Sequence, residues 1–197
     1  LTPAEIGVVI GVMFLSSALV QIPFGIMLDR FGARRMIVGW SSVAIIGTVI
    51  FGLAETSSGL TVGRTLIGIG HGASITGVYL LALAWASPER VASVAATTIA
   101  VAGALGGMIG TAPLAAAIEY LGFTDTFLYL ALGSLVSSIL IWFFVNDKPP
   151  GTRMENIKEH PKAAIMGLFK VIKDRNLWPI FAMALCFSVP FATIGGL

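Results

Sequence analysis

The residue best suited to chemistry is Arg64, the one charged side chain in an apolar run over residues 60–86. Placing a guanidinium inside a membrane costs about 2.5–3.5 kcal/mol on insertion scales, so such a residue is expected to face protein or a water-filled cavity. There it can bind an anion through paired hydrogen bonds. Two alternatives stay open: the Arg64 side chain reaches the outer membrane surface, or it binds a neighbouring carbonyl.

Further polar side chains follow Arg64 in the same run. His71 comes seven residues later and therefore shares a helix face with Arg64, with Gly68 leaving room between them. The His71 imidazole can change charge near neutral pH or hydrogen-bond a solute; the alternative is a neutral histidine bonded to a nearby carbonyl. Tyr79 adds a polar group near that face. Weaker candidates of the same kind are Gln21, Ser17 and Thr98.

Long apolar segments must hold these residues in place. Of the 197 residues, 56% are hydrophobic and 11% are charged, whereas soluble domains carry about 25% charged residues. A membrane-spanning helix needs about 20 apolar residues, and strands are not expected because the runs are long and do not alternate. We therefore predict an all-α, polytopic membrane helical bundle. Its six spans are 6–27, 36–54, 60–86, 91–118, 126–145 and 177–197.

Basic residues are confined to alternate loops. The loops 28–35, 87–91 and 146–176 hold every Lys and Arg except Arg64, while the loops near 1–5, 55–59 and 119–125 carry acidic residues only. Because basic loops face the cytoplasm, we expect these three loops to be cytoplasmic in a multi-pass protein of the cell membrane. The net charge of +2 then reflects contact with anionic lipid, and no nucleic-acid partner is expected.

The pattern divides the chain into three parts: a helical bundle over 1–145, a cytoplasmic linker over 146–176, and the start of a second bundle at 177–197. A Pro-Pro-Gly sequence ends the last helix of the first part. Inside the linker, apolar residues spaced for one helix face predict an amphipathic helix. This helix lies either on the membrane surface or against the bundle. The residues are Ile165, Leu168, Phe169 and Ile172.

Glycines four residues apart predict sites where helices pack closely in lipid. The pairs are Gly7 and Gly11, Gly68 and Gly72, Gly103 and Gly107, and Gly106 and Gly110.

The residue types argue against an enzyme. The chain has two His and one Cys, too few for a metal site at a recognised spacing, and it has no phosphate-binding Gly-Lys-Ser/Thr loop. Ser74 follows His71 closely but lies on another helix face, with no acid beside them. The single Cys186 is expected to be a small core residue. We therefore predict no catalysis, no cofactor and no metal.

The most specific motif joins the first two apolar runs. Residues 25–35 read Gly-Ile-Met-Leu-Asp-Arg-Phe-Gly-Ala-Arg-Arg. This resembles the signature between the second and third helices of the major facilitator superfamily, although Ala33 stands where that family usually has a basic residue. The resemblance implies a conformational latch, in which Asp29 pairs with a nearby Arg or with a helix N-terminus. Its residues are Gly25, Asp29, Arg30, Gly32, Arg34 and Arg35.

Other features are similar to the same family. Arg64 is followed by Gly68 and Gly70, as in the family's fourth helix, whose Arg is associated with the central cavity and with proton coupling. The layout places the visible spans as helices two to seven of twelve, so that 1–145 lacks the first helix of the N-terminal half and 177–197 begins the C-terminal half. An offset of ninety residues relates Pro23, Asp29 and Gly32 to Pro113, Glu119 and Gly122, which is consistent with inverted three-helix repeats.

The resemblance implies a monomeric secondary transporter that moves a small solute by alternating access, coupled to protons or another ion. Since the one charge inside a span is positive and no carboxylate lies mid-membrane, an anionic or neutral metabolite carried by symport is favoured. The alternatives are a multidrug-type efflux transporter and a transporter-like sensor that binds a ligand without moving it.

Overall fold

The computed structural model describes residues 2–147, 173–175 and 178–179. The chain divides into two compact units, Leu1–Glu155 and Asn156–Leu197. Apart from the five residues at 173–175 and 178–179, the predicted linker helix and the sixth predicted span lie outside the described residues. The helices of the first unit are α1 Pro3–Phe31, α2 Ala33–Leu53, α3 Ser57–Trp85, α4 Val91–Ile109, α5 Ala112–Leu121 and α6 Phe123–Phe144.

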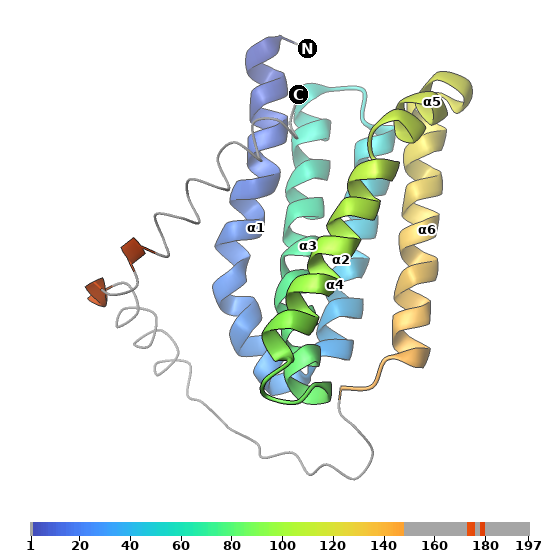
Figure 1. Cartoon of the computed structure of the whole chain (residues 1–197). Helices are drawn as coiled ribbons and strands as arrows, with labels where there is room; N and C mark the ends of the chain where they lie inside the picture. The colour runs from blue at the N-terminus through green and yellow to red at the C-terminus, as the bar shows by residue number, and fades with distance from the viewer. Residues whose placement is uncertain (1, 148–172, 176–177, 180–197) are drawn as a thin grey trace. The chain divides into compact units, whose positions relative to one another are not determined.

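Five segments of the described residues are long and apolar enough to cross a membrane. The helices alternate in direction, and α3 packs mainly on α1 and α2 while α6 packs on α2. In Figure 1, α4 crosses in front of α3, and α5 turns across the end of α6. The predicted all-α membrane bundle is confirmed.

The fourth predicted span, 91–118, is not one continuous helix. The helix α4 ends at Ile109, and α5 begins at Ala112. Thr111 between them has φ −106° and ψ −111°, outside the helical region. Pro113 explains the interruption, because proline has no amide hydrogen to donate to the preceding turn and is tolerated in the first turn of a new helix. Residues Val91–Leu121 still form one membrane-length segment, as predicted, but the helix within it is interrupted at residues 110–111.

Glycine allows α3 to approach its neighbours. A Cβ at Gly72 would lie 2.7 Å from the Phe24 ring of α1, and one at Gly68 would meet Met13 and Ser16 of α1. The close packing predicted for Gly68 and Gly72 is confirmed. At Gly110 an added Cβ would meet only carbonyl oxygens of Gly106 and Gly107 in the preceding turn. Among the described residues, it would meet nothing within 4 Å at the remaining predicted positions Gly7, Gly11, Gly103, Gly106 and Gly107.

Among the described residues, single glycines form two of the connections between helices. Gly32 alone separates α1 from α2, and Gly122 alone separates α5 from α6. Their backbones are nearly identical, with φ 84° and ψ 158° at Gly32 and φ 85° and ψ 164° at Gly122. This positive φ favours glycine, which has no Cβ to clash. The offset of ninety residues in the sequence is thus matched in backbone geometry at this pair.

A cluster of buried residues lies beside the Gly32 corner. Leu28 at the end of α1 is only 1% exposed, and it packs with Ala33, Met36 and Ile37 at the start of α2. Ile141 near the end of α6 contacts this cluster. The Gly32 corner, residues 86–90 and residues 145–147 lie at one end of the unit, which we call the cationic end. The loop motif therefore rests on a packed support.

Candidate functional site

Arg64 lies two turns into α3, between α1 and α2. Its Nη1 donates to the Met13 Sδ of α1 at 3.5 Å, and its guanidinium carbon lies 4.6 Å from the centre of the Phe51 ring of α2. Phe51 in turn packs against Phe123 and Phe127 of α6, with ring centres 5.5 and 4.9 Å away. Three helices thus supply the surroundings of one cation.

The hydrogen-bonding capacity of Arg64 is only partly used. A thioether sulfur is a weak acceptor, whereas a guanidinium has five N–H donors. The Arg64 Nε is buried and has no hydrogen-bond partner among the described residues. Because an unpaired buried donor of a charged group is costly, Arg64 is suited to receive an oxygen acceptor from a solute or from another part of the protein.

His71 lies on the same helix as Arg64 but faces a different space. Its Nδ1 is 3.0 Å from the Ile67 carbonyl oxygen, and since a carbonyl only accepts, Nδ1 carries the proton. The imidazole is exposed and lines a groove of about 690 Å³ between α2, α3 and α6. We call this the serine groove. Its other polar lining residues are Ser41, Ser74, Tyr129, Ser134, Ser137 and Ser138.

Two hydroxyls of the serine groove already donate to their own helix. Ser134 and Ser137 donate to the carbonyls of Leu130 and Gly133, each at 2.9 Å. Their oxygen lone pairs remain able to accept. The groove therefore offers hydroxyl acceptors and the His71 imidazole, and neither Asp, Glu, Lys nor Arg is among its lining residues.

The remaining predicted pathway residues do not join this groove. Gly68 serves the contact with α1 instead of separating Arg64 from His71. Gln21 accepts a hydrogen bond from Thr76 at 3.3 Å, which links α1 to α3. Tyr79 is 47% exposed and is not among the groove's lining residues. Of the weaker candidates, Thr98 lines a second groove of about 690 Å³ between α3, α4 and α6.

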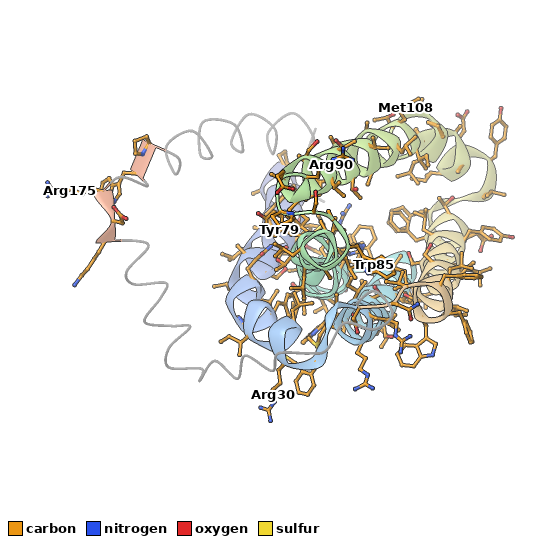
Figure 2. The ribbon with its side chains drawn as sticks, turned by 60° about the horizontal axis from the view of Figure 1, so that its bottom comes forward. Arg30, Tyr79, Trp85, Arg90, Met108 and Arg175 are labelled. Carbon is orange, nitrogen blue, oxygen red and sulfur yellow. The ribbon has the colours of Figure 1, made fainter. Side chains whose placement is uncertain are left out.

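The loop motif divides into exposed and anchored arginines. Arg30 and Arg35 are exposed, and Arg30 projects away from the bundle in Figure 2. Arg34 is half-buried, with its guanidinium 5.0 Å from the centre of a Trp142 ring on α6. A Cβ at Gly25 would meet nothing within 4 Å. The structure does not describe the side chain of Asp29, so its pairing with an arginine or a helix N-terminus stays a prediction.

An acid outside the predicted motif contacts the loop. The amide N–H of Arg34 donates to Asp147 Oδ1 at 2.6 Å, across 113 positions of sequence. The neighbouring Asn146 carbonyl accepts from Trp85 Nε1 at 2.9 Å. The segment after α6 is therefore hydrogen-bonded to the start of α2 and to the end of α3.

Comparison with known families decides the identity of this bundle. The family model described as "Major Facilitator Superfamily" matches residues 1–197. The chain belongs to the major facilitator superfamily. Within the superfamily, it is 28% identical over 172 residues to an "Uncharacterized transporter" of Buchnera aphidicola, which covers 86% of this chain and 42% of that protein.

Two further relatives carry substrate names. The "Probable sulfoacetate transporter SauU" of Cupriavidus necator is 28% identical over 76% of this chain and 34% of its own length. The human "Synaptic vesicular amine transporter" is 28% identical over 91% of this chain and 34% of its own length. The chain thus spans less than half the length of each of these superfamily members.

The sequence alone did not reveal the contact partners of Arg64 and Arg34. Met13 and Phe51, which contact Arg64, look like ordinary apolar residues in the sequence. Asp147 had a weak signal, because it is an acid at a helix end beside a basic linker. No spacing rule connects it to Arg34, since the contact depends on α6 packing against α2.

Proposed function

We propose that the chain forms part of a secondary transporter, which moves a small solute across the membrane by alternating access. Membership of the superfamily, the transporter names of the relatives and five membrane-length helices support this proposal. Alternating access requires two arrangements of packed helices around a central site. We assign this site to Arg64 and His71 of α3.

Arg64 carries the proposal about substrate class. It is the one basic residue of the described helices away from their first and last turns, and its buried Nε lacks a partner there. A guanidinium with free donors favours an anionic or neutral, oxygen-rich metabolite. The relative named for sulfoacetate is in line with an anion.

A cation is the alternative substrate class. The relative named for amines matches 91% of this chain. The Phe51 ring already contacts one cation, the guanidinium of Arg64. In a multidrug-type efflux transporter, Arg64 would hold the helices together through this contact and would not touch the solute.

We assign the coupling step to a proton, with His71 as its carrier. Its Nδ1 is fixed by the Ile67 carbonyl, so Nε2 is the atom that gains and loses a proton. We place the protein in the cell membrane as a monomer, with the cationic end in the cytoplasm.

The test is a thermal-shift screen of the complete protein in detergent. The probes are sulfoacetate, tartrate, glucose and the lipophilic cation tetraphenylphosphonium. A bound probe at about a hundred times its dissociation constant stabilises the folded protein by roughly 2.7 kcal/mol. We expect an anion to raise the melting temperature of the wild type but not of Arg64→Ala.

Two further results decide the role of Arg64. Arg64→Lys should not restore the anion shift, because a lysine cannot form the paired contact. Stabilisation by tetraphenylphosphonium in both wild type and Arg64→Ala would instead support the efflux alternative and leave Arg64 a structural role.

A further inference from the structure

The helix α2 begins without a cap of its own. Its N-cap residue is Gly32, which has no side chain, and no side-chain hydrogen bond comes from that position. A helix start leaves amide donors unsatisfied, and a Ser, Thr, Asp or Asn at the N-cap normally accepts from the second or third of them. Arg34 is the second residue of α2, and its amide donates to Asp147 Oδ1 at 2.6 Å.

The shape of the corner fits the incoming carboxylate. A Cβ at Gly32 would lie 2.6 Å from Asp147 Oδ2, so only glycine leaves room for it. The carboxylate also lies at the positive end of the α2 dipole, where a negative charge is stabilising. Asp147 therefore satisfies a donor and a charge that the α2 sequence leaves unmet.

The second glycine corner supplies a comparison inside the same chain. Gly122 has the same backbone conformation as Gly32 and likewise precedes a helix with no side-chain cap. A Cβ at Gly122 would meet nothing within 4 Å. The two corners thus have the same backbone conformation. Among the described residues, only the Gly32 corner is contacted by a carboxylate.

Two neighbouring contacts fix the segment that carries Asp147. The Arg34 guanidinium lies over the Trp142 ring, and the Trp85 indole donates to the Asn146 carbonyl. Residues 142–147 are thereby connected to both α2 and α3, which brings Asp147 to the corner at little further loss of chain entropy. We call Gly32, Arg34, Trp142 and Asp147 together the Asp147 clasp.

We propose that Asp147 is a positioning residue, which caps α2 from a distant part of the chain and holds the Gly32 corner rigid. The anchored part of the motif then acts as a fixed support for the exposed Arg30 and Arg35. The capping stands on the geometry alone. Its importance for solute movement rests on the proposed function.

The test is hydrogen–deuterium exchange of the complete protein in nanodiscs, with wild type, Asp147→Ala and Asp147→Asn. Loss of a cap should speed exchange at the Arg34 amide about two- to thirtyfold in Asp147→Ala. Asp147→Asn keeps an oxygen acceptor but loses the charge, so its exchange should be intermediate. Amides of α3 and of the Gly122 corner should not change.

Asp125→Ala is the matched control, because Asp125 is an exposed acid in the first turn of α6 beside the free corner. It should leave exchange at Arg34 as in the wild type. Unchanged exchange at Arg34 in Asp147→Ala, or equal acceleration throughout the unit, would overturn the proposal. If Asp147→Ala does not fold, Asp147→Asn decides in the same way. The exchange readout needs no solute, so failure of the proposed transport activity would leave this result intact.

Discussion

The two glycine corners allow backbone strain and a steric contact to be separated at single residues. An alanine at positive φ costs about 1–2 kcal/mol. At Gly32 the added Cβ also meets the Asp147 carboxylate, whereas at Gly122 it meets nothing. We expect Gly32→Ala to lower the melting temperature in detergent clearly more than Gly122→Ala does.

A double-mutant cycle identifies the source of the difference. Once Asp147→Ala has removed the carboxylate, Gly32→Ala should cost no more than Gly122→Ala, because only the backbone strain remains. Equal losses for the two single glycine variants would show that Asp147 moves aside freely.

At the level of residues, the sequence predicts chemistry better than it predicts partners. The sequence marks Arg64 and His71 because a charge and an imidazole stand out in apolar runs. Their neighbours could not be predicted, since Met13 and Phe51 reach Arg64 through the packing of three helices. Asp147 shows the same limit, because its contact with Arg34 joins positions 113 residues apart.

Individual helices were predictable because the apolar runs have the length of a membrane span. The boundaries of α2, α3 and α6 lie within three residues of the predicted spans 36–54, 60–86 and 126–145. The break between α4 and α5 was missed, because a run of small apolar residues looks helical throughout and hides the effect of Pro113. The surroundings of each helix were predictable only where glycine spacing marked a close contact.

The faces of α3 and α4 should differ in their tolerance of added volume. Gly68→Ala would press a methyl group into Met13 and Ser16, and overpacking of this kind typically costs about 1–3 kcal/mol. Gly103→Ala meets nothing among the described residues and should gain up to about 1 kcal/mol from helix propensity. Thermal unfolding in detergent of both variants measures the difference. A loss at Gly103 as large as at Gly68 would show that another segment covers α4 in the complete protein.

At the scale of the whole molecule, the sidedness of the bundle is a prediction from basic residues. In a background in which Cys186 and every cysteine elsewhere in the complete protein are replaced by serine, new cysteines at Glu55 and Ser87 mark opposite ends of the unit. We expect a membrane-impermeant maleimide added to intact cells to label position 55 and to spare position 87 until the membrane is permeabilised. The reverse pattern would invert the topology and place the Asp147 clasp outside the cell.

The superfamily could be recognised from one loop and the spacing of spans, because the motif of residues 25–35 is long, specific to the superfamily and placed between two apolar runs. Substrate class could not, since the chain covers 34% of the relatives named for sulfoacetate and for amines.

The one-residue corners also have a practical consequence for anyone who engineers this chain. At positions 32 and 122 a helix ends and the next begins with no slack, so an epitope or a fluorescent protein inserted there would have to force two helices apart. The turn at 86–90 is five residues long and mostly exposed. It is the place where a reporter can be added while the bundle keeps its shape.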